Sequence, residues 1–119
     1  MGRSTRCGLL ASVGLLAAGG LAGSAVANAD ALAYLVNVTV RPGYDFTSAE
    51  DALAYGHQLC DEVAAVHGYA QIIDEIRSHF GTSDYYQATY LINQAVNKLC
   101  PAQIFALRNS AASYVPPAA

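Results

Sequence analysis

Two stretches that each hold a cysteine near their end constrain this chain more than any other feature. The first runs from Ala52 to Val63 and contains Cys60, and the second runs from Tyr90 to Pro101 and contains Cys100. In both stretches apolar residues recur at the spacing of an amphipathic helix, and Cys60 falls on the apolar arc of its helix. We therefore expect two helices that pack on one core and whose cysteines are joined.

The N-terminal segment has the layout of a secretory signal peptide. A short basic start is followed by the uncharged run Gly8 to Val26 and then by Ala27-Asn28-Ala29, which supplies the small residues of a cleavage site. We predict a signal peptide over residues 1–29, removed by cleavage before Asp30. An uncleaved anchor helix is the alternative, because about 20 apolar residues can span a bilayer. Five glycines in the run weaken a permanent helix.

Cleavage would remove Cys7 and leave Cys60 and Cys100 as the cysteines of the mature chain. An even number of cysteines in an exported chain implies a disulfide. We therefore predict a Cys60–Cys100 bond and an extracytoplasmic protein, either secreted or held in the cell envelope. A metal site is the competing interpretation, because His57 lies one helical turn before Cys60. Since a second tight pair of ligands is missing, we predict no metal.

The mature chain predicts an all-α fold, with four to five short helices stapled by one disulfide. The expected divisions are a signal peptide over 1–29, a helical domain over 30–113 and a disordered tail over 114–119. The expected helices begin at Asp30, at the Thr47-x-x-Glu50 capping box, at Tyr69, at Thr82 or Ser83, and at Gln103. Short connections between such helices are typical of a small helical domain.

Three local patterns bear on where these helices end. Val36, Val38 and Val40 alternate with polar residues, so the first helix is expected to stop at Val38, with a strand-like tail as an alternative. Gly68 is the natural residue to follow the second helix, and Gly81 is expected to end the third.

Charge excludes two kinds of partner. Without Arg3 and Arg6, the mature chain keeps four basic against nine acidic residues, a net charge of −5. A field of that sign opposes binding to a nucleic-acid backbone and docking on anionic lipid headgroups. We also expect no stable membrane span after cleavage, and the oligomeric state stays open.

Residues suited to acid–base chemistry are present but not grouped. We expect a structural role for His57, His67 and His79, because each lacks convergent partners in the sequence pattern. The adjacent pairs Asp61-Glu62 and Asp74-Glu75 are expected to be solvated, since neighbouring side chains on a helix diverge. No nucleophile elbow and no phosphate-binding loop occurs in the sequence. We therefore expect no catalytic residue and no enzyme.

The two cysteine stretches also carry a family resemblance. Ala-Tyr-Gly-His-Gln-Leu-Cys-Asp-Glu (54–62) and Gln-Ala-Val-Asn-Lys-Leu-Cys-Pro (94–101) resemble the paired signatures of a mycobacterial exported family, domain of unknown function 732. The resemblance covers about residues 30–103. It implies export, one cysteine pair and a helical fold, and it assigns neither a catalytic residue nor a ligand.

Two classes of function remain. The first is a binding or interaction module of the cell envelope, with an unidentified protein or envelope partner. The second is a carrier of haem or another small hydrophobic ligand, because tyrosine and histidine can ligate haem iron and the chain has 8 Tyr and 3 His. Since no spacing directs a Tyr/His pair into one pocket, we assign no cofactor. A Soret shift on adding haemin would distinguish the two classes.

One stripe of side chains is the candidate partner-binding site. Tyr86, Tyr90, Asn93 and Asn97 are spaced 4, 3 and 4 residues apart, so they share one face of the fourth helix, away from its apolar arc. Tyrosine combines a large contact area with a polar tip, which suits recognition. The alternative is that the stripe packs under the first helix or the C-terminal segment and exposes only its hydroxyls.

Overall fold

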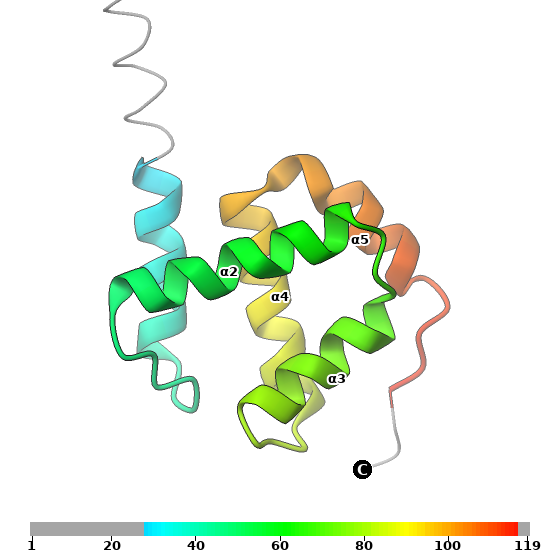
Figure 1. Ribbon diagram of the computed structural model, residues 1–119, viewed down its shortest axis with the longest axis horizontal. Coiled ribbons are helices and arrows are strands. Elements are labelled where there is room, and N and C mark those ends of the chain that lie inside the picture. Colours follow the sequence, from blue (N-terminus) through cyan, green and yellow to red (C-terminus); the bar gives the residue numbers. More distant parts are fainter. Residues whose placement is uncertain (1–27, 117–119) are drawn as a thin grey trace, which may run out of the picture. The chain divides into compact units, whose positions relative to one another are not determined.

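The computed structural model describes residues 28–116, and these form helices joined by short loops (Figure 1). The first helix covers residues 28–40. The others are α2 (Ala49–Ala64), α3 (Tyr69–His79), α4 (Tyr85–Leu99), the short 3-10 helix η1 (Pro101–Gln103) and α5 (Ile104–Ala111). No strand occurs among the described residues, and the predicted all-α class is confirmed. The predicted signal peptide lies almost wholly outside the described residues and stays a prediction.

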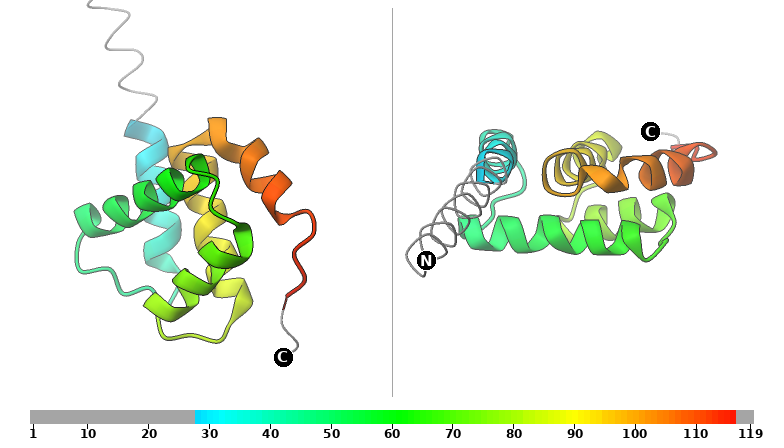
Figure 2. Two further views of the ribbon diagram at one scale, coloured as in Figure 1. Left: turned by 45° about the vertical axis from the view of Figure 1, so that its right-hand side comes forward. Right: turned by 90° about the horizontal axis from the view of Figure 1, so that it is seen from above.

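The helical domain is the second of two compact units, Ala31–Ala119. Within it the helices lie in two layers: α2 and α3 form one, while the first helix, α4 and α5 form the other (Figure 2). The inner sides of both layers share one core, and the contact between α2 and α4 is the most extensive between two labelled helices. The largest fully buried side chains are Tyr34, Val38, Leu59, Ile72, Ile73, Ile76, Leu91, Ile92 and Val96.

The first helix continues to residue 40 and has no strand-like tail. Tyr34 and Val38 are one turn apart and both point into the core, where the Tyr34 hydroxyl donates to the carbonyl of Ala52 at 2.8 Å. This four-residue repeat buries more apolar surface than the alternation of valines would, so the helical period prevails. Val36 and Val40 consequently face solvent.

The N-terminus of α2 is capped one residue later than the sequence predicted. Ser48, not Thr47, is the N-cap, and its Oγ accepts from the backbone N–H of Asp51 at 3.0 Å. The Asp51 carboxylate in turn accepts from the N–H and the hydroxyl of Thr47, both at 3.3 Å. The arrangement is a variant of the capping box, in which Asp51 replaces Glu50 and its carboxylate accepts from Thr47, the residue before the N-cap.

The C-terminus of α2 differs from the prediction in a way that strains the backbone. Val66, not Gly68, takes the left-handed conformation, with φ 63°. The N–H of His67 donates to the carbonyl of Glu62 at 3.0 Å, and the N–H of Val66 donates to that of Val63 at 3.1 Å. These two bonds define a Schellman motif, which usually holds glycine at this position. A β-branched residue there costs on the order of 1–3 kcal/mol.

The same motif ends α3 without strain. Gly81 has φ 60° and its N–H donates to the carbonyl of Ser78 at 3.2 Å, while the N–H of Thr82 donates to that of Arg77 at 3.0 Å. The prediction that Gly81 ends this helix is confirmed.

The predicted disulfide is present and ties the two layers together. Cys60 of α2 and Cys100, directly after α4, are bonded, with Cα atoms 6.1 Å apart. One turn before Cys60, Gly56 is buried against the other layer. A Cβ there would lie 2.6 Å from Leu99 Cδ1 and 2.8 Å from the Tyr34 ring, so the close approach of the layers requires glycine.

The C-terminal segment after α5 packs on the domain through one side chain. The Tyr114 ring lies 5.0 Å from that of Tyr69 and 5.6 Å from that of Tyr85, centroid to centroid. The disorder predicted for residues 114–119 stays a prediction, and residues 117–119 lie outside the described part.

Candidate functional site

The stripe predicted on α4 is divided between solvent and the domain. Tyr86 is 72% exposed, and Asn93 and Asn97 are also exposed. Tyr90 is half-buried: its hydroxyl donates to the carbonyl of Asn37 at 3.3 Å, and the Arg41 guanidinium lies 4.4 Å above its ring. Tyr90 therefore packs against the first helix, as the alternative interpretation of the stripe expected, and Tyr86 does not.

Amide side chains fix the first helix beside α4. Asn37 Nδ2 donates to Gln94 Oε1 at 2.8 Å, and Arg41 Nε donates to Gln87 Oε1 at 2.8 Å. Gln87 Nε2 also donates to the carbonyl of Pro42 at 2.8 Å, so the loop that leaves the first helix is held as well. The two helices run antiparallel, because later residues of one meet earlier residues of the other.

The solvent side of the first helix carries an apolar line that the sequence analysis missed. Leu32, Val36 and Val40 are 61%, 50% and 73% exposed, and they recur at every fourth residue. Residues four apart lie on one side of a helix. The spacing was readable in the sequence, but the alternation of valines drew the interpretation toward a strand.

The apolar line and the exposed part of the α4 stripe point the same way. The buried sides of both helices face α2 and α3, so their opposite sides face away from that layer. We call the residues Leu32, Val36, Val40, Tyr86, Asn93 and Asn97 the outer face. It combines apolar groups with amides.

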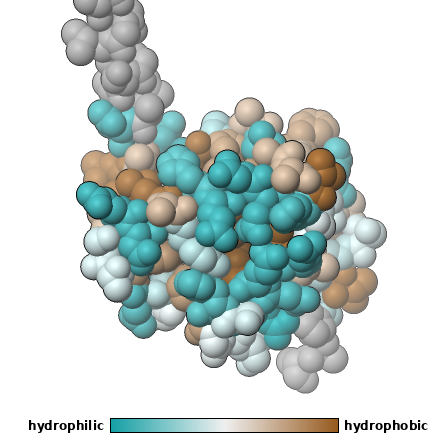
Figure 3. Space-filling view, viewed as in Figure 1, coloured by the Kyte–Doolittle hydropathy of each residue, from teal (hydrophilic) through white to brown (hydrophobic). Residues whose placement is uncertain are grey.

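Charge separates the outer face from the opposite side of the domain. Residues 31–41 and α4 contain Arg41 and Lys98 and no carboxylate. The α2 and α3 helices contain six carboxylates and one arginine. The space-filling view of the α2–α3 side is accordingly dominated by hydrophilic residues (Figure 3).

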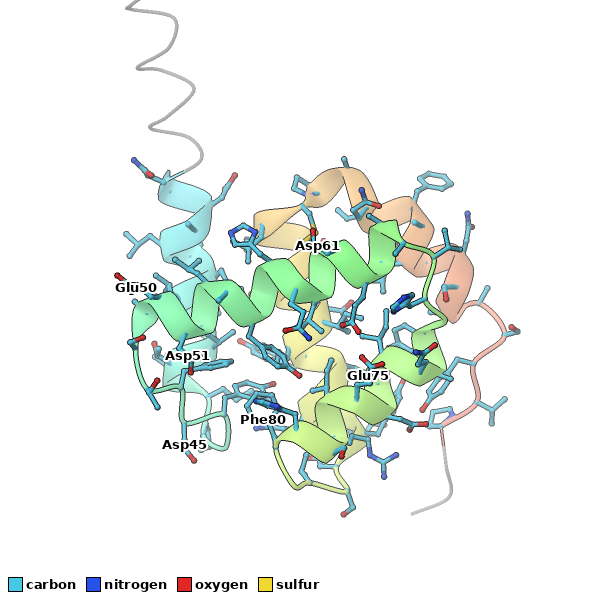
Figure 4. The ribbon with its side chains drawn as sticks, viewed as in Figure 1. Asp45, Glu50, Asp51, Asp61, Glu75 and Phe80 are labelled. Atoms are coloured by element: carbon cyan, nitrogen blue, oxygen red, sulfur yellow. A yellow bond between two sulfur atoms is a disulfide. The ribbon has the colours of Figure 1, made fainter. Side chains whose placement is uncertain are left out.

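A pair of carboxyl groups meets between α2 and α3. Glu75 lies on the side of α3 that faces α2 (Figure 4), and its carboxyl is within hydrogen-bonding reach of that of Glu62. The Glu62 side chain is only 14% exposed, and its Oε1 lies 3.7 Å from His67 Nδ1. Gln71 Nε2 donates to Glu75 Oε1 at 3.2 Å. The expectation of solvated carboxylates holds for Asp61, Asp74 and Glu75, which are exposed, and is wrong for Glu62, which the packing of α2 on α3 covers in part.

The pair shifts the acidity of both groups. Burial, and then the hydrogen bond to Glu75, raises the pKa of Glu62 to about 7. The same hydrogen bond holds the pKa of Glu75 below its usual range. One proton on the pair, donated by one carboxyl to the other, is therefore favoured over two ionised carboxylates.

The histidines do not converge on one site. His67 contacts Glu62, whereas the His79 ring packs on Tyr55 at 4.8 Å and on Phe80 at 4.7 Å, and His57 is exposed on α2. Within residues 28–116 no group of three or more His, Cys, Asp or Glu side chains is placed to hold a metal ion.

Enclosed space near these groups is small. A cavity of about 30 Å³ lies between the end of α2, α3 and α5, lined by residues that include Val63, Ile72 and Leu107. That volume has room for one or two water molecules. No helix in the described part of the chain has the length and apolar character needed to cross a membrane.

The chain matches the family described as "Protein of unknown function (DUF732)" over residues 22–102, a range that includes both bonded cysteines. This match confirms the predicted resemblance to domain of unknown function 732, whereas the mycobacterial origin and the export that the resemblance implied stay predictions. No curated protein and no solved structure matches the chain.

Proposed function

We propose that this chain, which belongs to the DUF732 family of proteins of unknown function, is a binding module that works outside the cytoplasm and holds a partner protein on its outer face. The observation that carries the proposal is the exposed apolar line of Leu32, Val36 and Val40 on the first helix, which packs beside α4, the helix that carries exposed Tyr86. Binding, and not catalysis, is the role that these residues support.

The outer face has the composition of a recognition surface. Aliphatic side chains gain free energy when a partner removes them from water, and tyrosine is enriched among residues that dominate binding energy. Asn93 is free to form hydrogen bonds through its side chain, while Asn97 donates to the backbone carbonyl of Asn93 at 2.7 Å. The side-chain hydrogen bonds between the first helix and α4 fix the two halves of the face relative to each other. The face therefore loses little conformational entropy when a partner binds.

The chemistry of the face also favours one kind of partner. The absence of carboxylates from residues 31–41 and α4, together with Arg41 and Lys98, suits a protein surface with an apolar centre and acidic or carbonyl groups at its rim. Two cations are few for binding a phosphate backbone. A protein is therefore the occupant to which the proposal commits.

The alternative function, a carrier of haem or another small hydrophobic ligand, has less structural support than a module that binds a protein. Pockets that bury a drug-sized ligand measure about 300–1,000 Å³. The enclosed cavity beside α5 measures about 30 Å³, and the larger hollows, of about 400–650 Å³, are open to solvent and would cover little of a ligand. Tyr34, Tyr44 and Tyr69 are buried in the core, whereas His57 is exposed. We therefore expect no Soret shift when haemin is added.

Export is the second part of the proposal. A disulfide in a small domain is typical of oxidising compartments. The basic and apolar N-terminal segment supports the same location, and intact mass of the protein from culture medium or envelope tests it. A mass that retains residues 1–29 would contradict cleavage.

Site-specific photo-cross-linking in the producing cells tests the binding face. A photoreactive phenylalanine analogue at Tyr86 should yield one dominant heterologous product, and the same analogue at Asp61, on α2, should not. The double change Val36→Asn and Val40→Asn should remove that product while the melting temperature stays within about 2 °C. The control Val66→Asn removes a valine that is still more exposed, at 88%, but lies outside the face, and it should leave the product unchanged.

Three results would overturn the proposal. The first is that cross-linking from Tyr86 and from Asp61 gives products in equal yield. The second is that the Tyr86 product persists when Val36 and Val40 are both changed to Asn, and the third is that this product contains only a second copy of the chain.

A further inference from the structure

We propose that the α2–α3 contact is a pH-sensitive latch, held closed by one proton shared between the carboxyl groups of Glu62 and Glu75. The two residues are hereafter the carboxyl latch. This inference concerns the layer opposite the outer face and does not depend on the proposed binding function.

The geometry places the two carboxyl groups where they cannot both be charged without cost. Glu62 comes from α2 and Glu75 from α3, and they are close enough for a hydrogen bond between their side chains. The Glu62 side chain is 14% exposed and Glu75 lies at the surface, so solvent screens the interaction between them only in part. Two ionised carboxylates at hydrogen-bonding distance repel, whereas one proton between them forms a strong charge-assisted bond.

The neighbours of the carboxyl latch act in different senses. On α3, Gln71 donates to Glu75, which favours the ionised form of that carboxyl and so the arrangement with one proton. On α2, burial raises the pKa of Tyr55 to about 12, so its phenol stays neutral over the relevant range. The connector between the two helices supplies His67, with Nδ1 3.7 Å from Glu62 Oε1, and a positive charge on that ring would favour two ionised carboxylates instead.

The other helices that pack on α2 add little to this balance. Lys98 of α4 and Arg108 of α5 are the charged residues of those helices, and in the described structure neither pairs with Glu62 or Glu75. His79 of α3 packs on Tyr55 and lines an open hollow together with Glu75 and Asp74. The groups that face each other directly at the carboxyl latch are Glu62, Glu75 and His67.

The direction of the pH effect follows from linkage. The pKa of Glu62 is raised on folding from 4.5 to about 7. The stability it contributes is thus fully present below about pH 4.5 and is lost as the pH rises through about 7. Glu75 has a lowered pKa and acts in the opposite sense, because its contribution is lost as the pH falls through its folded value. The latch is therefore tightest between mildly acidic and neutral pH and opens above neutral pH.

Opening the latch would act on the most strained turn of the domain. Glu62 also supplies the carbonyl that accepts the N–H of His67 and closes the Schellman motif around Val66. Repulsion between Glu62 and Glu75 would thus destabilise the turn in which Val66 is already held in the left-handed region. We expect the α2–α3 connector to loosen first.

The direct test is a carboxyl ¹³C NMR titration of the intact domain. The Glu62 carboxyl should titrate with a midpoint near pH 7, at least about one unit above that of exposed Asp61. A Glu62 midpoint near the ordinary value for glutamate, about 4.3, would overturn the proposal. This measurement needs no variant and so does not depend on whether one folds.

Variants then test whether the proton acts on stability. The melting temperature of the wild type should fall by about 5 °C between about pH 6 and pH 8. Glu62→Gln should remove most of that slope, because the amide donates to Glu75 at every pH. The matched control Asp61→Asn removes the neighbouring carboxylate and should keep the wild-type slope. Equal slopes in all three proteins would overturn the proposal.

Hydrogen exchange locates the opening. After correction for the intrinsic pH dependence, backbone amides of residues 65–72 should exchange about tenfold faster at about pH 8 than at about pH 6 in the wild type, and equally at both in Glu62→Gln. An unchanged rate in the wild type would contradict the latch even if the carboxyl midpoint is raised.

Discussion

The two layers of the domain bury the same core yet present opposite chemistry to solvent. The α2–α3 layer carries six carboxylates and one arginine, whereas residues 31–41 and α4 carry two cations and no carboxylate. The net charge of −5 expected for the mature chain therefore describes one side of the molecule. Asp30 and Asp84 lie near the N-terminal ends of these two helices, so a partner that the whole-chain charge would exclude can still meet the part of the outer face between them.

The layers also differ in the kind of side-chain contact that holds their helices together. Amide hydrogen bonds fix the first helix to α4 through side chains that carry no charge, such as Asn37 and Gln94. The α2–α3 contact instead includes a titrating carboxyl pair. The first arrangement is insensitive to pH and the second is not, so the expected binding face is rigid while the opposite side responds to its surroundings.

The largest expected effect comes from cutting the covalent link between the layers. Cys60→Ala together with Cys100→Ala should lower the free energy of unfolding by about 2–5 kcal/mol, because the unfolded chain gains the freedom that the bond removes. Urea denaturation followed by circular dichroism measures it. Reduced wild type should unfold at a similar urea midpoint. A variant as stable as the oxidised protein would mean that packing alone holds the layers together.

A second change separates the buried and exposed tyrosines of the α4 stripe. Tyr90→Ala should cost about 2 kcal/mol, since it removes a half-buried ring, its hydrogen bond to Asn37 and the contact with Arg41. Tyr86→Ala, at an exposed position, should stay within about 0.5 kcal/mol. Thermal unfolding of both variants gives the comparison. Equal losses would place Tyr86 in the core and remove it from the outer face.

The smallest expected effects concern the C-terminal ends of α2 and α3. Both end in a Schellman motif, but the left-handed position holds Val66 in one and Gly81 in the other. Val66→Gly should raise stability by about 1 kcal/mol, because glycine enters the left-handed region without a Cβ clash. Gly81→Val should lower it by a similar amount. Chemical denaturation with an unchanged m-value tests both. If Val66→Gly is destabilising, the valine makes contacts that outweigh its strain.

Patterns with a strong physical cause were predictable from the sequence. The apolar arcs placed α2, α3 and α4 within a few residues, and the even cysteine count gave the Cys60–Cys100 bond. Boundaries decided by competing hydrogen bonds were less predictable. Asp51 can close a capping box as well as Glu50 can, and the Schellman bonds forced Val66 into a conformation that sequence rules reserve for Gly68.

The candidate sites were harder to predict, because they depend on which helices become neighbours. Helix spacing placed Tyr86 and Tyr90 on one stripe, but only the position of the first helix determines that Tyr90 is covered. In the same way, Glu62 and Glu75 each belong to a locally polar face, and their contact exists only after α2 and α3 pack. Periodicity describes one helix at a time and carries no information about such pairs.

The disulfide also divides the chain topologically. Cys60 and Cys100 are separated by 40 residues, so the bond closes a covalent ring that contains α3 and α4 in full. The first helix, most of α2 and α5 lie outside that ring. Noncovalent contacts hold the first helix to the rest of the domain, because Tyr34 and Val38 are buried in the core and Asn37 is hydrogen-bonded to Gln94. The half of the outer face on the first helix is therefore supported by packing and hydrogen bonds, whereas the half on α4 is carried by a helix inside the covalent ring.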